Sequence, residues 1–206
     1  MDNLCWFDSF DCSGYYQMPN IKKIEGVPDH IIDFSAALHG HDYKSGVHFF
    51  IDDNKFERIW KDPYRYFPIL RKYAFVFSPD FSLYTNMPIA QQIWNTYRSR
   101  MIGHMMQQYG LNVIPTISWS TSDSFSFCFD GIQSGSTVAI ASTGTNRNKN
   151  NHLLFTTGFR HMIKAITPKT VIFYGLFPED KYEGVKIIHF PACFFGKQRI
   201  SYMEKK

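Results

Sequence analysis

Short apolar runs alternate along this chain with longer segments in which apolar residues recur every three or four positions. The short runs are rich in β-branched and aromatic residues, as buried strands are. The longer segments have the spacing of amphipathic helices. A chain that repeats strand and helix in this way covers a mostly parallel sheet with helices. We therefore expect an α/β fold whose strands form one mainly parallel sheet.

Seven segments have the character of strands. They are residues 31–34, 47–51, 74–77, 112–119, 137–141, 171–174 and 185–188. Pro115 removes one backbone donor from the fourth segment, which indicates a bulge or a position whose N–H faces away from a neighbour. A complete eight-stranded (β/α) barrel usually needs roughly 250 residues, and this chain has 206. We expect an open sheet flanked by helices, or an incomplete (β/α) barrel.

The longest predicted helix begins near Pro88, where a missing N–H does no harm, and ends before Gly110. We expect an apolar stripe along this helix to be buried: Ile89, Ile93, Tyr97, Met101 and Met105. Another helix is predicted from about Asn151 to Ile166. Between residues 55 and 72, Pro63 and Pro68 predict a short or broken helical region. Residues 125–129 are expected to form a short helix over the sheet.

Length and composition favour a single globular domain. Hydrophobic residues make up 44% and charged residues 19% of the chain, and 206 residues are too few for two well-buried cores. We expect an irregular N-terminal arm over residues 1–24 and one α/β domain over residues 25–206. No signal peptide is evident, and no apolar run approaches the roughly 20 residues of a membrane span. The prediction is a cytoplasmic protein without a membrane partner.

Net charge and cysteine content exclude few kinds of partner or site. The net charge is +4, with basic residues scattered along the chain, which permits an anionic partner such as a nucleotide or nucleic acid without demanding one. The cysteines show no CxxC spacing, so a zinc knuckle or a disulfide framework is disfavoured. Aromatic residues reach 17%, which is typical either of a Phe-rich core or of a surface that stacks on bases.

Aspartates follow several of the predicted strands. Ligands of parallel α/β folds bind at the carboxyl ends of the strands, so these aspartates are candidate site residues. Asp80 and Asp123 are the candidate catalytic residues, and Asp80 with Asp52, or its neighbour Asp53, the candidate metal ligands. Converging carboxylates hold Mg²⁺ or divide acid and base roles. The alternative is that each aspartate only caps the helix after it.

Two polar loops complete the predicted rim. Small hydroxyl residues, a glycine and an arginine between a strand and a helix are typical of an anion cradle. The candidate ligand-binding residues there are Ser142, Thr143, Gly144 and Arg147. Their spacing matches neither GxxxxGK[ST] nor GxGxxG, and a flexible surface loop is the alternative. Trp119 and Ser120, after another strand, suit contact with a base or sugar, unless Trp119 merely covers the core.

The central half of the chain, from Phe75 to Gly175, contains six blocks that carry a family likeness. These blocks are Ser78–Tyr84, Gln91–Gly103, Tyr109–Pro115, Ser118-Trp119, Phe129–Ile132 and Ser142–Gly144. Together they resemble a family of phages and mobile elements, domain of unknown function 4417. The resemblance implies a phage or mobile-element product, for which nucleic-acid handling and interference with host defence are both reasonable roles. It brings no established activity and no catalytic residues.

Two functional hypotheses follow. In the first, the rim binds a phosphate-bearing ligand, a nucleotide or nucleic acid. Residues 142–147 would hold the anion, and Asp80 and Asp123 would support Mg²⁺-dependent hydrolysis. In the second, a non-catalytic protein binds a host protein and inhibits a defence system, through exposed aromatic residues. Those residues are Trp6, Phe7, Tyr15 and Tyr16. Convergent carboxylates in a pocket would favour the first hypothesis, and a flat apolar patch the second.

Overall fold

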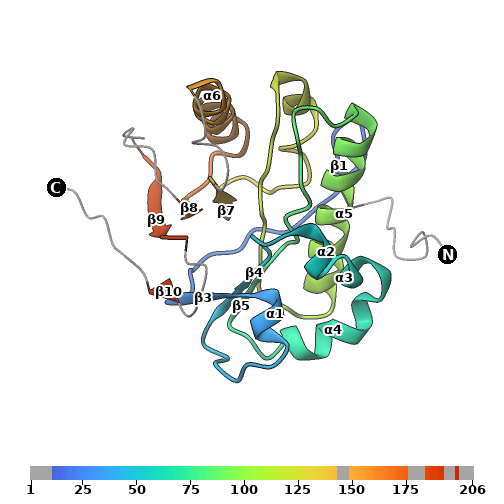
Figure 1. The fold of residues 1–206 in the computed structure, drawn as a ribbon, viewed down its shortest axis with the longest axis vertical. Helices are drawn as coiled ribbons and strands as arrows, with labels where there is room; N and C mark the ends of the chain where they lie inside the picture. The colour runs from blue at the N-terminus through green and yellow to red at the C-terminus, as the bar shows by residue number, and fades with distance from the viewer. Residues whose placement is uncertain (1–10, 143–148, 176–183, 193–197, 200–206) are drawn as a thin grey trace.

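Most of the strands lie in two mainly parallel sheets. The computed structural model describes residues 11–142, 149–175, 184–192 and 198–199 (Figure 1). The first sheet has the order β10 (Gln198–Arg199), β3 (His30–Asp33), β4 (Gly46–His48), β5 (Phe75–Phe77) and β6 (Val113–Ile114). Only β10 runs antiparallel in it. The second has the order β7 (Thr137–Ala141), β8 (Thr170–Tyr174) and β9 (Lys186–Phe190), all parallel.

The prediction of one continuous sheet is therefore wrong, and Pro115 supplies the physical reason. The Pro115 carbonyl accepts from the Ala139 N–H at 2.9 Å, so the N–H that proline lacks would face β7, and the pairing of β6 with β7 is shortened. A parallel bridge between Thr116 and Ala139 still joins the two sheets. The Ile117 N–H donates to the Ala139 carbonyl at 2.8 Å. Strands β3 to β9 consequently follow one another in chain order and point the same way, so their carboxyl ends share one rim.

The strands curve around a shared apolar interior. One buried cluster contains a residue from each of six strands: Ile31, Phe77, Ile114, Ala139, Ile172 and Ile188. Two further buried clusters lie beneath the helices, one under α1 to α5 and one under α6. Within the described ranges no ladder joins β9 to β10, so the ring of strands is not closed. The expected α/β fold, with mostly parallel strands, flanking helices and no closed barrel among the described residues, is confirmed.

The flanking helices begin and end largely as local sequence signals predict. The region of Pro63 and Pro68 is broken into α2 (Asp53–Phe56), α3 (Arg58–Lys61) and α4 (Pro63–Leu70). The remaining helices are α1 (Phe34–Ala37), α5 (Ile89–Gln108), the 3₁₀ helix η2 (Ser122–Ser126) and α6 (Lys149–Ile166). In Figure 1, α6 lies beside β7 and β8, whereas α1 to α4 lie beside β3 to β5. No helix of the described chain is long and apolar enough to cross a bilayer.

The N-terminal segment contributes to the core. Two short strands, β1 (Cys12–Ser13) and β2 (Met18–Pro19), form an antiparallel hairpin that lies on α5. Ile21, which follows the hairpin, is fully buried and forms a parallel bridge with Ile132. A Cβ added at Gly103 of α5 would lie 2.4 Å from the Cδ1 of Ile21, so glycine allows this close approach.

Helix α5 does not bury the stripe that its apolar residues predict. Met101 and Met105 are buried, but Ile93 and Tyr97 are only partly so and Ile89 is 45% exposed. The buried face of α5 carries polar residues instead: Gln92, Asn95, Thr96, Arg98, Ser99, Arg100 and His104. This prediction fails because several of these side chains find partners in the loops that follow β5 and β6. The helix thereby lays a polar surface beneath the rim.

Candidate functional site

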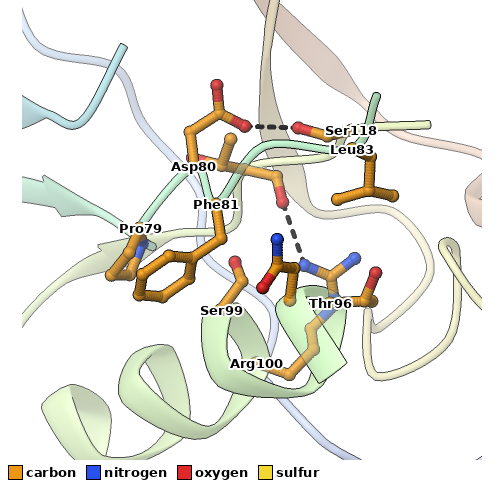
Figure 2. A pocket seen from close by; sticks show the side chains of 10 residues that line it. Pro79, Asp80, Phe81, Leu83, Thr96, Ser99, Arg100 and Ser118 are labelled. Carbon is orange, nitrogen blue, oxygen red and sulfur yellow. Dashed lines mark hydrogen bonds between the residues drawn. The ribbon is translucent and has the colours of Figure 1, made fainter. Parts of the chain in front are cut away.

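A small pocket opens where β5 and β6 end, against the polar face of α5 (Figure 2). It contains about 200 Å³ of empty space, its open mouth included. Its walls come from the loop after β5, the segment after β6, and α5. The lining residues are Pro79, Asp80, Phe81, Leu83, Thr116, Ser118, Asn95, Thr96, Ser99 and Arg100. The pocket therefore lies at the strand-end rim that the fold class predicts.

Asp80 is the titratable carboxyl group of this pocket. The Ser118 hydroxyl donates a hydrogen bond to Oδ1 of Asp80, and the two side chains point toward one another in Figure 2. Burial, together with a smaller contribution from the negative charge of Asp53, raises the pKa of Asp80 to about 7, against the opposing effect of the Ser118 hydrogen bond. A carboxyl group with this pKa exchanges its proton near neutral pH, as a general acid or base must.

Asp53, in α2, is the second carboxylate at this position. Its Oδ2 accepts from the Ser82 N–H at 3.1 Å and its Oδ1 from the Ser82 hydroxyl at 2.8 Å, which holds it against the loop containing Asp80. The adjacent Asp52, predicted as a metal ligand, is exposed and pairs with Lys55 at 3.1 Å. The sequence could not choose between the two, because either side chain could face the rim at the start of a helix.

Arg100 places a buried positive charge in the wall of the pocket. Its residue is only 2% exposed, and its guanidinium donates to the carbonyls of Asp130 at 2.9 Å, Thr116 at 3.0 Å and Cys128 at 2.7 Å. Burial lowers the pKa of Arg100 to about 10, so the group stays charged at neutral pH. The negative charge of Asp130 opposes this effect of burial and favours the charged form of Arg100.

Two hydroxyl groups in the same walls are buried without a partner. Thr96 is 4% exposed and Thr116 is 2% exposed, and the Oγ1 atom of each makes no hydrogen bond to the described protein. Their neighbours are satisfied, since the Ser99 hydroxyl pairs with that of Ser78 at 3.3 Å and the Asn95 amide donates to the Ser82 carbonyl at 2.8 Å. An unpaired buried hydroxyl costs about 1–3 kcal/mol.

Arg98 supports the wall of the pocket from α5. Its Nη1 donates to both carboxylate oxygens of Glu57, at 2.7 and 2.9 Å, and its Nη2 donates to Asn95 at 2.7 Å. Its guanidinium carbon lies 3.8 Å from the ring centroid of Phe81, a cation–π contact that holds this ring in the pocket wall. Sequence reasoning missed both arginines, because an arginine within an amphipathic helix is normally solvated.

Other predicted site residues lie elsewhere. Trp119 packs against α6, where a Cβ on Gly158 would lie 2.1 Å from its Nε1, and its ring centroid is 5.2 Å from that of Phe155. Ser120 is buried and donates its hydroxyl hydrogen to Gln92. Asp123 is exposed on η2 and is absent from the pocket lining.

The predicted anion cradle is only partly visible. Ser142 follows β7 and is buried, and its N–H donates to the Tyr174 carbonyl at 2.9 Å. Thr143, Gly144 and Arg147 lie outside the described residues. The structure thus brings Asp80 together with Asp53 and with polar residues of α5, and it leaves the cradle untested.

Comparison with known proteins gives the family. Residues 10–191 match the model of a family described as "Domain of unknown function (DUF4417)". The chain belongs to this family. The likeness noted in the central blocks is thereby confirmed, and it extends across most of the DUF4417 chain. The described pocket lies wholly within the matched residues.

The relatives of this DUF4417 chain support a phage origin. It is 42% identical over 171 residues to the Gene 1 protein of Mycobacterium phage L5. The aligned region covers 81% of this chain and 74% of that protein. It is 37% identical over 171 residues to the Gene 1 protein of Mycobacterium phage D29. The aligned region covers 81% of this chain and 63% of that protein. The chain thus spans less than two thirds of the D29 protein. No solved structure matches it.

Proposed function

We propose that this phage DUF4417 protein binds a phosphate-bearing ligand, a nucleotide or nucleic acid, at the pocket where β5 and β6 end. The binding uses a divalent cation held by Asp80 and Asp53. The observation that carries the proposal is the carboxyl group of Asp80, which titrates near pH 7 in a strand-end pocket and feels the charge of a second carboxylate. Perturbed carboxyl groups of this kind cluster at functional sites.

A cation accounts for both carboxylates. The negative charge of Asp53 contributes, after burial, to the raised pKa of Asp80. Mg²⁺ binds through one or two protein carboxylates and completes its coordination with water and ligand phosphate oxygens. A bound cation therefore favours the ionised form of Asp80 and attracts the phosphate. If Asp80 and Asp53 held such a cation, it would supply charge stabilisation and an activated water for the hydrolysis of a phosphate ester.

The size of the pocket limits what enters it. The roughly 200 Å³ of empty space in this pocket includes the open solvent at its mouth, so the enclosed part is far smaller than a site that surrounds a whole small molecule. We therefore propose that the ligand lies mostly outside the pocket, along the rim. We propose that the part of the ligand outside the pocket contacts residues at and after the end of β7. These residues are Ser142, Thr143, Gly144 and Arg147.

Titration calorimetry tests the proposal directly. Wild type is titrated with Mg²⁺ and Mn²⁺, and then with ATP and single-stranded DNA in the presence and absence of Mg²⁺. We expect Asp80→Asn and Asp53→Asn each to weaken cation binding by at least about 10-fold, the effect of losing one charged ligand. Asp62→Asn is the matched control, because Asp62 is exposed and makes no capping bond in α4.

Two results would count against this function. One is a wild-type protein that binds neither cation nor any phosphate-bearing ligand of the panel. The other is an Asp80→Asn variant with unchanged cation affinity.

Binding to a host protein is the second candidate, and the β1–β2 hairpin favours it. Tyr15 is 89% and Tyr16 is 40% exposed at its turn, and their rings lie 5.1 Å apart in an edge-to-face contact. Exposed aromatic pairs serve as anchors in protein interfaces. Trp6 and Phe7 lie outside the described residues. A crosslinker placed at Tyr15 in infected cells should capture one host protein, and Tyr16→Ser should abolish that capture if the hairpin is the contact.

A further inference from the structure

We infer that the surface around α4 binds single-stranded nucleic acid, with basic side chains on the phosphates and exposed tyrosines on the bases. Five basic residues of α3, α4 and the turn after α4 form what we call the basic face: Arg58, Lys61, Arg65, Arg71 and Lys72. Three tyrosines lie beside them: Tyr43, Tyr64 and Tyr109.

This surface lies away from the strand-end pocket. Tyr43, Lys72 and Tyr109 precede β4, β5 and β6 respectively, so they lie at the amino ends of these strands. The pocket lies where β5 and β6 end. In Figure 1, α4 and α6 lie at opposite ends of the view. Binding at the basic face therefore does not depend on the function proposed for the rim.

The net charge of the chain is concentrated in this segment. Residues 58–72 contain five basic residues and one acidic residue, a net charge of +4, and the whole chain also carries +4. The other residues are therefore neutral in sum, because carboxylates balance the basic residues that are spread among them. All five basic residues of the segment are exposed. A local excess of exposed positive charge attracts polyanions.

Carboxylates do not neutralise the basic face. Elsewhere on the surface, Lys55 pairs with Asp52 at 3.1 Å. Among the described residues, no ion pair or hydrogen bond engages the charged groups of the basic face. Their N–H donors are therefore available to phosphate oxygens, which accept strong hydrogen bonds from guanidinium and ammonium groups.

Aromatic rings accompany these cations. The Arg71 guanidinium lies 5.9 Å from the ring centroid of Tyr109, and the Lys72 ammonium lies 5.9 Å from that of Tyr43. Such contacts position a cation without using its hydrogen-bond donors. Tyr64 is 52% exposed, and its ring centroid lies 6.3 Å from that of Tyr109. Exposed rings between cations provide a surface on which bases stack while their phosphates meet positive charge.

The combination favours single-stranded nucleic acid over other polyanions. Binding to an anionic membrane needs an apolar helix face that is free to insert. The apolar face of α4 is instead buried in the protein, through Pro63, Tyr66, Phe67 and Leu70. A duplex stacks its bases on one another, so the exposed tyrosines would contribute little to binding it. Unpaired bases use both the rings and the cations.

Fluorescence anisotropy with labelled oligonucleotides tests the basic face. The probes are oligothymidylate and oligouridylate of about 20 nucleotides and a DNA duplex of the same length. Vesicles of phosphatidylcholine and phosphatidylserine are tested by sedimentation. Every titration contains EDTA and is repeated at about 50, 100 and 200 mM NaCl, because the slope of affinity against salt reports the number of phosphate contacts.

The charge variant is Arg71→Gln/Lys72→Gln. Its control is Lys164→Gln/Lys186→Gln, which removes two exposed lysines, one from α6 and one from β9. At about 50 mM NaCl the charge variant should bind single strands roughly 10-fold more weakly than wild type. Its salt slope should fall by about 1.4, since each phosphate contact to a single strand contributes about 0.7. The control should match wild type.

The stacking variant is Tyr64→Ala. Its control is Tyr84→Ala, because Tyr84 is 61% exposed but lies in the loop after β5. Tyr64→Ala should weaken single-strand binding by at least about 5-fold, the effect of losing one stacked base. It should leave the salt slope unchanged, because no phosphate contact is lost. This readout separates stacking from charge.

Several results would overturn the inference. They are a wild-type protein that binds neither single strand, a charge variant that binds like its control, and a Tyr64→Ala variant that binds like Tyr84→Ala. Binding of the duplex or the vesicles as tightly as the single strands would also overturn it, since charge alone would then explain the affinity.

The same titrations separate the basic face from the proposed rim site. In EDTA, Asp80→Asn should bind the single strands like wild type, because no cation is held at the rim and the basic face lies elsewhere. If Asp80→Asn weakens binding while the charge variant does not, the strand lies at the rim and the basic face is not its site. If the basic face binds while Asp80→Asn and Asp53→Asn leave Mg²⁺ affinity unchanged, the proposed rim function fails and this inference stands.

Discussion

Ser118 donates its hydroxyl hydrogen to Oδ1 of Asp80, a hydrogen bond between side chains that are 38 positions apart in the chain. The bond joins the ends of two neighbouring strands, β5 and β6, at the rim. It stabilises the ionised carboxylate and so opposes the burial that raises the pKa of Asp80. The proton affinity of the candidate site thus depends on a contact that only the parallel sheet creates.

Removal of this hydrogen bond should raise the pKa of Asp80 further. Ser118→Ala deletes the donor and leaves the burial unchanged, so the carboxyl should titrate above about pH 7. The measurement is ¹³C NMR of aspartate-labelled protein across pH 4–9. Ser126→Ala is the control, because the exposed Ser126 hydroxyl donates to the Asp123 carbonyl, outside the pocket. A lower or unchanged pKa in Ser118→Ala would refute the role assigned to this bond.

Asp80→Asn should make stability less dependent on pH. The pKa of Asp80 is about 7 in the folded protein against an ordinary 3.8, so between these values the folded state holds a proton that the unfolded state has lost. The contribution of the Asp80 carboxyl group to the free energy of unfolding therefore decreases as pH rises from about 4 to 7. Relative to wild type, the variant should gain about 1–3 kcal/mol between pH 4.5 and 8. Urea melts at both pH values measure this, and a gain in the opposite direction would contradict it.

Gly158→Ala should destabilise the protein although alanine favours helices. Trp119 occupies the space of the missing side chain, and its ring is held by Phe155 and Phe129. Overpacking of this kind costs about 1–3 kcal/mol, which exceeds the gain of about 1 kcal/mol from helix propensity. Thr157→Ala, at the exposed neighbouring position, should be neutral or slightly stabilising. Equal thermal melts for Gly158→Ala and wild type would show that the Trp119 ring can move away.

The two ends of α5 should respond differently to truncation. Ile102 is fully buried, so Ile102→Ala should cost about 2–5 kcal/mol in the free energy of unfolding. Ile89 is 45% exposed, so Ile89→Ala should change stability by less than about 0.5 kcal/mol. Denaturant melts of both variants test the assignment. A large loss at Ile89 would mean that the first turn of α5 is covered in solution.

Much of the fold could be predicted from the sequence, because the signals that define its elements are local. Apolar runs marked the segments of β3 to β9, Pro63 and Pro68 marked the broken helices, and Gly110 marked the end of α5. The Gly110 backbone has φ of 87°, a conformation that glycine adopts without strain. Alternation of strands and helices was enough to indicate a parallel arrangement and the rim at which Asp80 lies.

Only the tertiary structure decided which polar groups meet at that rim. Asp53 rather than Asp52 faces Asp80, since the Ser82 loop binds one of these adjacent carboxylates and leaves the other in solvent. The buried face of α5 is polar where its sequence suggests an apolar stripe, because Arg100 is solvated by carbonyls 16 to 30 positions along the chain. The spacing of apolar residues along a helix or strand predicts which residues share one of its faces. Whether a polar side chain can be buried depends on hydrogen-bond partners that distant segments supply.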